Sequence, residues 1–437
     1  MFNRIVLSIG CIFLLFLAWV VVLNMKSPLQ EQTEFIAAAD TEIAKGTYAN
    51  AEPYLAQAVA YNTNQTFGVL EKLKDVYLKL GDTQNYVNTL ETETSRTDCT
   101  ASVYQELAQY YIDQNKLSDA LPLLKTGIGR TNDQGLIDFY EAHRYAFDTA
   151  GNTYDDVTAF FNGGIQVEKA GLWGIANSKG SLIIPCNYPQ ISTYDSTSKC
   201  VVAVQSDQKV VALNTKNQVV AIFDKTVAKL GNISQNYIPM QLDDGKWIIA
   251  NGQLISNGKE YDGLGTVSNT AIAIESGGKW GVLSLTGKMP MIIPYEYDGI
   301  VTDISGACYA QSAAFVQKDG KTYLFSNGAQ LSDPYEDAKP FTDSGMAAVK
   351  QSGKWGFSDA TGQIRISPQF DDALSFTKVS SDESLAAVKI GDKWGYVNSS
   401  GKVVIEPQFM DARDFSGGTA PVKTDQGWQF IKLVEYE

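Results

Sequence analysis

Hydrophobic and polar residues follow three different patterns along this chain, and each pattern predicts a different kind of structure. Residues 5–23 form one apolar run of 19 residues without a charge. From about residue 35 to residue 161, apolar residues recur at intervals of three and four, as in Leu70, Leu73 and Val76, which is the periodicity of amphipathic helices. After residue 161, short apolar runs are separated by turns rich in Gly, Asn and Asp, which predicts many short β-strands.

These patterns predict a multidomain chain. We expect the segments to be a cytoplasmic tip and transmembrane anchor (1–26), a linker (27–34), a helical region (35–161) and an all-β region (162–437).

The apolar run at residues 5–23 is long enough to nearly span a bilayer core of about 30 Å as a helix. It ends in bulky residues, Trp19 to Leu23, where a cleaved signal peptide needs small ones. We therefore expect a signal-anchor, with a cleaved signal peptide as the alternative. Arg4 precedes the run, so the positive-inside rule places the N-terminus in the cytoplasm and the remaining domains outside it, in a single-pass membrane protein.

The helical region contains a second repeat. Its turns are centred on Gly46, Gly81, Asn115 and Gly151, about 35 residues apart. Gly and Asn suit the left-handed residue that ends a helix. This helix–turn–helix period resembles the tetratricopeptide repeat family, which implies an α-solenoid of about four repeats whose concave face binds peptides or proteins. A helical spacer is the alternative.

The all-β region repeats one phrase built on tryptophan. Trp173, Trp280, Trp355 and Trp394 are each followed by Gly, whereas Trp247 and Trp428 lack that glycine. Val210 and Tyr323 stand at the corresponding position of two degenerate copies. The eight positions are 32 to 43 residues apart, a period typical of stacked supersecondary units.

The phrase resembles the bacterial WG-repeat (KWG-repeat) family over about 270 residues. The resemblance implies β-rich repeats and no catalytic residues. Eight units of about three strands favour a propeller-like ring over an open β array, because closure removes exposed sheet edges. The last unit lacks its final strand, and a strand near residues 160–167 is our candidate to complete it.

Two roles are open for the aromatic positions of the repeats. A tryptophan buries a large apolar area and can seal one hairpin against the next, while the adjacent glycine lets a neighbouring backbone approach. The alternative is a row of exposed rings that stack on sugars. We expect structural repeat positions at Trp173, Trp247, Trp280, Tyr323, Trp355, Trp394 and Trp428.

Composition narrows the range of partners. A net charge of −14 argues against nucleic acid, whose phosphates require basic patches. The cysteines form no CxxC pair, so we expect free thiols; a Cys186–Cys200 bridge is the single short-range candidate for a disulfide.

The sequence contains no pattern that indicates catalysis. His143 is the one histidine, and a zinc site requires three or four His or Cys ligands at suitable spacing. Several repeat copies contain an aromatic residue followed by an acidic one, as in Tyr297-Asp298 and Phe370-Asp371, which we call aromatic–acidic turns. The acidic residue, such as Asp371, suits a turn hydrogen bond. We therefore expect no enzyme, cofactor or metal. The prediction is a membrane-anchored scaffold that recognises protein partners in the bacterial envelope, with a cell-wall or glycan-binding module as the alternative.

Overall fold

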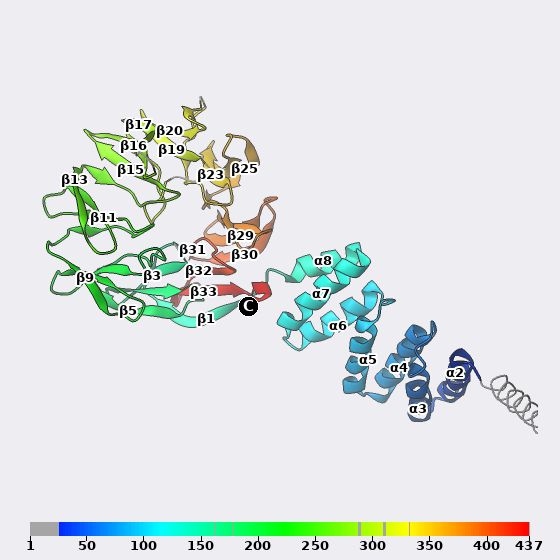
Figure 1. Ribbon diagram of the computed structural model, residues 1–437. Helices are drawn as coiled ribbons and strands as arrows, with labels where there is room; N and C mark the ends of the chain where they lie inside the picture. The colour runs from blue at the N-terminus through cyan, green and yellow to red at the C-terminus, as the bar shows by residue number, and fades with distance from the viewer. Residues whose placement is uncertain are drawn as a thin grey trace, which may run out of the picture. The chain divides into compact units, whose positions relative to one another are not determined.

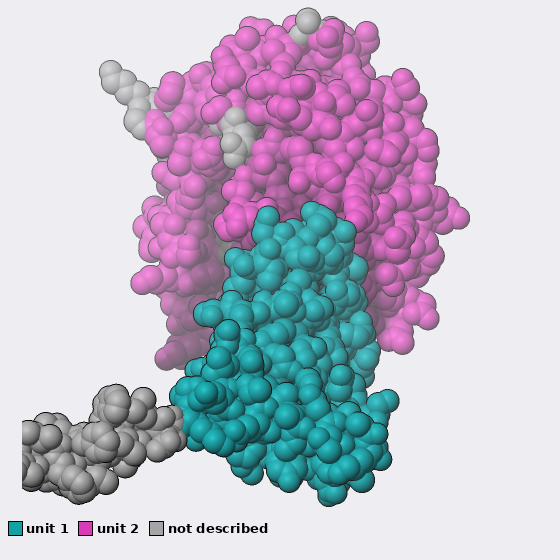
Figure 2. Space-filling view, turned by 90° about the vertical axis from the view of Figure 1, so that its right-hand side faces the viewer, with its two compact units in different colours: residues 1–144 teal, residues 145–437 magenta. Residues whose placement is uncertain are grey.

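The computed structural model describes residues 26–161, 163–177, 179–286, 290–308, 312–331 and 333–436. The chain divides into two compact units, residues 1–144 and residues 145–437, which Figure 2 colours separately. The described part of the first unit is helical, and the second unit is a ring of β-sheets (Figure 1).

The first unit consists of helices that pack in consecutive pairs. Gly46, Gly81 and Asn115 have the positive φ that was predicted for the turns within the pairs. Leucines from successive helices are fully buried and hold the pairs together. The helices are α2 (Pro28–Ala44), α3 (Tyr48–Val59), α4 (Thr66–Leu80), α5 (Thr83–Ser95), α6 (Ala101–Asp113), α7 (Leu117–Thr131) and α8 (Gln134–His143).

Both ends of the helical region differ from the sequence-based boundaries. The expected linker at residues 27–34 is helical, because Ser27 and Gln30 form a reciprocal capping box and Pro28 occupies the first helical position. The fourth expected turn, at Gly151, lies in strand β1 (Phe147–Tyr154) of the second unit. A turn-like sequence at the right spacing therefore belongs to a sheet.

The expectation of a transmembrane helix and a single-pass membrane location is corrected. No helix within residues 26–436, as far as they are described, combines the length and the apolar character that crossing a membrane requires. The apolar run at 5–23, on which the expectation rested, lies outside the described residues.

The described strands of the second unit form eight sheets, which we call blades 1 to 8 and which together make an eight-bladed β-propeller (Figure 1). Each blade is given from its inner to its outer strand. Blades 1 to 4 are β2 (Asp156–Val157), β3 (Gly164–Lys169), β4 (Leu172–Asn177), β5 (Leu182–Tyr188); β6 (Gln190–Ile191), β7 (Val201–Val204), β8 (Val210–Leu213), β9 (Val219–Phe223); β10 (Lys229–Leu230), β11 (Ile238–Gln241), β12 (Trp247–Ala250), β13 (Ser256–Tyr261); and β14 (Gly263–Leu264), β15 (Ala271–Ser276), β16 (Lys279–Ser284), β17 (Met291–Tyr297).

Blades 5 to 8 follow the same order. They are β18 (Gly299–Ile300), β19 (Ala313–Lys318), β20 (Lys321–Ser326), β21 (Ala329–Gln330); β22 (Asp337–Ala338), β23 (Met346–Gln351), β24 (Lys354–Asp359), β25 (Ile364–Phe370); β26 (Asp372–Ala373), β28 (Ser384–Ile390), β29 (Lys393–Asn398), β30 (Val403–Phe409), with β27 (Thr377–Lys378) beside β28; and β31 (Asp411–Ala412), β32 (Thr419–Thr424), β33 (Gly427–Leu433), β1.

Blade 8 closes the ring by combining the two ends of the second unit. Strand β1 pairs antiparallel with β33, Phe147 opposite Leu433 and Tyr154 opposite Trp428. The expected latch at residues 160–167 is therefore misplaced: it is an earlier segment, 147–154, that completes the last blade. Residues 164–169 instead form β3 within blade 1.

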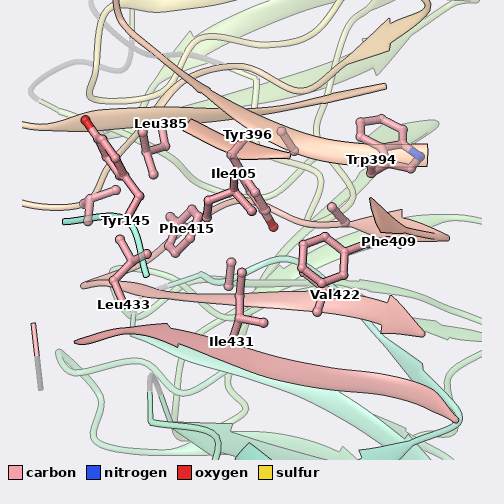
Figure 3. Packing of buried hydrophobic residues seen from close by; sticks show 14 residues of the cluster. Tyr145, Leu385, Trp394, Tyr396, Ile405, Phe409, Phe415, Val422, Ile431 and Leu433 are labelled. Atoms are coloured by element: carbon pink, nitrogen blue, oxygen red, sulfur yellow. The ribbon is translucent and has the colours of Figure 1, made fainter. Parts of the chain in front are cut away.

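Neighbouring blades bury apolar side chains between their faces. Figure 3 shows the cluster between blades 7 and 8, where Tyr396 and Phe415 pack with their ring centroids 4.7 Å apart. Trp394, Phe409 and Ile431 belong to the same cluster.

The glycine after each tryptophan allows the outer strand to approach. A methyl group at Gly395 would lie 2.4 Å from the Ile405 carbonyl oxygen, and the other three glycines of this type are equally close to their outer strands. At this point the register between β29 and β30 shifts by two residues, from Trp394–Phe409 to Tyr396–Ile405. Blade 2 has no glycine there, and its register is regular at Val210–Phe223. In the four blades with a WG glycine the shift begins at that glycine, whereas in blades 2 and 3 it lies further along the strand pair.

One buried ion cluster lies within the helical unit. Glu93 is fully buried, and neither carboxylate oxygen makes a hydrogen bond of normal geometry. Lys74 Nζ is 3.7 Å from Glu93 but closer to Glu106 (2.8 Å) and Glu71 (3.1 Å). Burial raises the pKa of Glu93 to about 8, and the charge of Lys74 opposes this shift only in part.

We predict that Gly395→Ala destabilises the propeller by about 1–3 kcal/mol, because the new methyl group overpacks against the β30 backbone. Urea unfolding followed by tryptophan fluorescence measures the effect, since six of the seven tryptophans lie in the second unit. Gly129→Ala in α7 is the control, because no atom lies within 4 Å of its methyl position. An unfolding midpoint for Gly395→Ala equal to wild type would contradict the steric explanation.

We predict that the stability of the helical unit falls as pH rises from about 4.5 to about 8. The folded state holds the Glu93 proton more tightly than the unfolded state does. The stability that this proton contributes is therefore fully present below the ordinary glutamate pKa of 4.5, and it is lost as pH rises through the raised pKa of about 8. Glu93→Gln should flatten this dependence and stabilise the unit above pH 8 by about 1–3 kcal/mol. Helical circular dichroism during unfolding measures both effects. Exposed Glu91→Gln is the control, and an unchanged pH dependence in Glu93→Gln would disprove the assignment.

Candidate functional site

A cavity of about 610 Å³ lies at the centre of the propeller, and we call it the central cavity. Its walls come from blades 1 to 5, chiefly from their inner strands and from three tryptophans. It is lined by Thr158, Gln166, Trp173, Pro189, Gln190, Ile191, Lys229, Leu230, Gly231, Asn232, Pro239, Trp247, Leu264, Gly265, Thr266, Trp280, Ile300 and residues 302–306.

The repeat aromatics divide into two groups. Trp355, Trp394 and Trp428, on blades 6 to 8, are buried. The other four are half-buried, and three of these line the central cavity: Trp173, Trp247 and Trp280. Tyr323 of blade 5 is half-buried against the core between blades 4 and 5. The repeat position is therefore structural on one side of the ring and accessible on the other.

The residue that follows each inner strand accounts for the accessibility of the three tryptophans in the cavity wall. Its backbone N–H bonds the next strand in every blade, so the eight positions are equivalent. On blades 1 to 4 this residue is small: Thr158, Ser192, Gly231 and Gly265. On blades 5 to 8 it is larger: Val301, Lys339, Leu374 and Arg413.

Two of the larger residues cover the tryptophan of their own blade. The Arg413 guanidinium lies 4.3 Å from the Trp428 ring centre, and the Lys339 ammonium lies 4.9 Å from that of Trp355. No such cover exists over Trp173, Trp247 or Trp280 from this position, because the residue there is Thr or Gly. These small and larger residues can be read from the sequence, but they are recognised as equivalent only when the eight inner strands are aligned.

The polar side chains of the cavity wall are mostly engaged between blades. Gln166 of blade 1 donates to the Ile191 carbonyl, and Gln190 of blade 2 accepts from the Leu230 N–H at 2.8 Å. Asn232 accepts from Thr193 N–H and donates to the Ser305 carbonyl. The cavity thus offers a ligand three indoles, aliphatic side chains and one ammonium group, beside the Thr302 hydroxyl and the half-buried Asp303 carboxyl.

That ammonium group belongs to Lys229, an exposed residue on β10. Its Nζ lies 5.9 Å from the centre of the Trp247 ring, and it has no ion pair among the described residues. A carboxylate in the cavity would meet both an unpaired cation and an aromatic face.

The floor of the cavity is a short loop from blade 5, residues 302–306. Asp303 accepts hydrogen bonds from Ser305 N–H (2.8 Å) and Ala307 N–H (2.9 Å), which fix the turn. Thr266 of blade 4 donates its N–H to the Gly306 carbonyl at 2.8 Å. Exposed Ile304 adds an apolar surface to this floor.

Asp303 lines the central cavity and, together with Asp414, also lines a smaller neighbouring cavity of about 300 Å³. Burial raises the pKa of Asp414 to about 7, and the charge of Asp303 raises it further. Burial also raises the pKa of Asp303.

The aromatic–acidic turns and the lysine before the tryptophan join successive blades. Lys279 of blade 4 binds Asp298 of blade 5 at 2.6 Å, and Asp298 also accepts from Asp319 N–H. Hydrogen bonding to this lysine lowers the Asp298 pKa. The same pairing recurs in Lys246–Asp262 and Lys354–Asp371. Asp371 accepts a hydrogen bond from Gly391 N–H in the next hairpin instead of from its own turn, and it also makes an ion pair that the sequence did not reveal.

The remaining candidate residues are separate from the cavity. Cys186 and Cys200 are free thiols, so the candidate disulfide between them is not formed. His143 ends α8, where its Nδ1 contacts the Phe139 carbonyl. Within the described residues, no three His, Cys, Asp or Glu side chains are grouped so as to hold a metal ion.

Three comparisons with solved structures show low sequence identity. BamB from Moraxella catarrhalis has a TM-score of 0.45 and 10% identity over 66% of this chain and 100% of that one. Hsv2p of Kluyveromyces lactis has a TM-score of 0.37 and 12% identity over 56% and 97% of the two chains. The Dos1 propeller has a TM-score of 0.39 and 8% identity over 67% and 95%. A search of curated proteins gave no match.

The family comparison agrees with the repeats seen in the structure. The family described as WG containing repeat matches residues 173–204, 335–355, 355–394 and 394–428. Each of these matches contains at least one repeat aromatic. The second unit of this chain is therefore a β-propeller that carries WG containing repeats.

Proposed function

We propose that this chain is a non-catalytic binding scaffold whose propeller holds a protein partner at the central cavity. The observation that carries this proposal is the group of half-buried indoles, Trp173, Trp247 and Trp280, around one concave site. Aromatic side chains in a desolvated pocket are the usual anchors of protein recognition.

The cavity chemistry favours a peptide segment with apolar side chains and a carboxylate. Leu230, Ile300 and Ile304 supply aliphatic contacts beside the indoles. Lys229 supplies a positive charge without an ion-pair partner in the described structure. A volume of about 610 Å³ accommodates a few side chains rather than a folded domain, so a loop or chain end is the natural ligand.

The helical unit supports the same type of function. Its paired helices are consistent with the tetratricopeptide-like arrangement that we propose, and such solenoids bind peptides. A cavity of about 560 Å³ lies against α2, α3 and α4, lined partly by Ile43, Tyr48 and the exposed Leu78. We propose that it is a second peptide surface.

A glycan ligand is the second candidate, because half-exposed indoles stack on sugar rings. The hydrogen bonding of the wall weighs against it. Sugars require several free polar groups, whereas Gln166, Gln190 and Asn232 are engaged between blades.

A photo-crosslinking amino acid that replaces Ile304 tests the proposal in the organism that naturally produces this protein. Ile304 forms the floor of the cavity, so a bound protein should give a discrete adduct that mass spectrometry identifies. The same replacement at Leu182, exposed on the outer strand β5, is the control and should not give this adduct.

We predict that Trp247→Ala reduces the Ile304 adduct about tenfold or more, because the loss of a central aromatic anchor typically costs about 2 kcal/mol. The far-ultraviolet spectrum of the variant should stay that of the wild type. If no protein adduct forms but oligosaccharides shift the indole fluorescence of the wild type, the ligand is a glycan. If the adduct is equal at Ile304 and Leu182, the cavity is not the binding site.

A further inference from the structure

The cavity of about 300 Å³ beside the central cavity, which we call the side cavity, contains two carboxyl groups without a charge partner. Its walls come mainly from blades 5 to 8, the half of the ring in which the tryptophans on blades 6 to 8 are buried. Asp303 and Asp414 both line it, and neither makes an ion pair with another described residue.

Asp414 has an acceptor that the described part of the chain does not satisfy. Its Oδ1 is buried and has no hydrogen-bond partner there. A buried acceptor without a donor is unfavourable, and folded proteins rarely contain one. A donor from outside the chain is therefore the natural partner of this oxygen.

Asp303 is fixed in place but keeps one oxygen free. The hydrogen bonds from Ser305 N–H (2.8 Å) and Ala307 N–H (2.9 Å) both go to its Oδ1. Oδ2 accepts none from the residues that the structure describes. The two carboxyl groups are close enough that the charge of Asp303 raises the pKa of Asp414. Two carboxylates in one cavity attract a cation.

The basic side chains of the same wall are engaged elsewhere. Arg413 Nη1 binds Asp411 at 3.0 Å and its guanidinium lies over Trp428, while the Lys339 ammonium lies over Trp355. Burial raises the pKa of Asp414 to about 7, so the charge of Arg413 does not compensate the buried carboxyl. Arg413 Nε is itself buried without a partner, which makes a carboxylate the competing ligand.

We propose that the side cavity binds a primary ammonium or guanidinium group at the end of an aliphatic stem. The charged end lies between Asp303 and Asp414, where it donates to the free oxygens. Ile304, Pro340 and Leu374 supply an apolar wall for the stem. A volume of about 300 Å³ admits one side chain or one small molecule.

Two sources carry this chemistry: a lysine or arginine side chain of a protein partner, and a small free amine. The site itself does not depend on a partner in the central cavity, because its carboxyl groups and apolar wall belong to the side cavity alone or, for Asp303 and Ile304, to both cavities.

Binding of n-pentylamine to the purified full chain tests the site, with n-pentanoate as the ligand of opposite charge. Saturation-transfer difference spectra, recorded above the raised pKa of Asp414, measure both affinities. The wild type should bind pentylamine and prefer it to pentanoate. Asp414→Asn should weaken pentylamine binding about tenfold or more, because one buried charge of the pair is lost.

Asp382→Asn is the matched control, because it removes an exposed carboxylate outside the side cavity and should leave the affinity unchanged. Three results would overturn the proposal: pentanoate binds as tightly as pentylamine, Asp414→Asn binds pentylamine like the wild type, or the wild type binds no pentylamine and the cavity holds water only. The first and third need no variant, so they remain decisive if Asp414→Asn does not fold.

The photo-crosslinker at Ile304 separates the two sources, because Ile304 lines both cavities. If a partner's side chain supplies the cation, Asp414→Asn also lowers the yield of the protein adduct. If the ligand is a free amine, the adduct is unchanged while pentylamine binding is lost. Absence of any adduct would contradict the protein partner but would leave the pentylamine titration, and with it this site, unaffected.

Discussion

The structure of the second unit depends on one interaction, the pairing of β1 with β33. Each blade buries apolar residues against its two neighbours, so an open row of eight blades would leave two apolar faces in water. The β1–β33 ladder, from Phe147–Leu433 to Tyr154–Trp428, builds blade 8 from both ends of the unit. It places Trp428 and Phe430 against the first strands of blade 1 in one cluster. Ring closure, and therefore a cavity with walls on several sides, follows from this pairing.

Much of the propeller could be predicted from the sequence, because the residues that indicate it act within a single blade. The tryptophan marks, the turn glycines and the strand prolines are determined by single-blade geometry, so they recur at a visible period. The latch strand could not be identified in this way. The sequence TAGNTYDD has the spacing of a fourth helical turn, and only its long-range pairing with β33 decides that it is a strand. The helix start at Ser27 was missed although its capping box is a local signal.

The candidate site was less predictable than the fold. Every tryptophan mark occupies the same place in its blade, and sequence reasoning therefore treated all of them as one class. The structure separates them by the size of the residue after the inner strand: Gly231 leaves Trp247 accessible, whereas Arg413 covers Trp428. This residue has no fixed distance from its tryptophan, because the loop between them varies in length. Its effect appears only when the strands converge on the ring centre.

In blade 2, Val210 and Val211 replace the tryptophan and glycine of the repeat, and the strand register differs as well. The WG glycine is needed where the outer strand bulges toward the tryptophan strand, as the 2.4 Å approach at Gly395 demonstrates. In blade 2 the register stays regular from Val210–Phe223 to Ala212–Ala221, so a side chain at Val211 is tolerated and no glycine is required. The register of blade 2 shifts only beyond this point, between Ala212–Ala221 and Leu213–Val219, and β9 contains no proline. The absence of tryptophan and glycine at Val210 and Val211 thus accompanies a register shift that lies further along the strand pair.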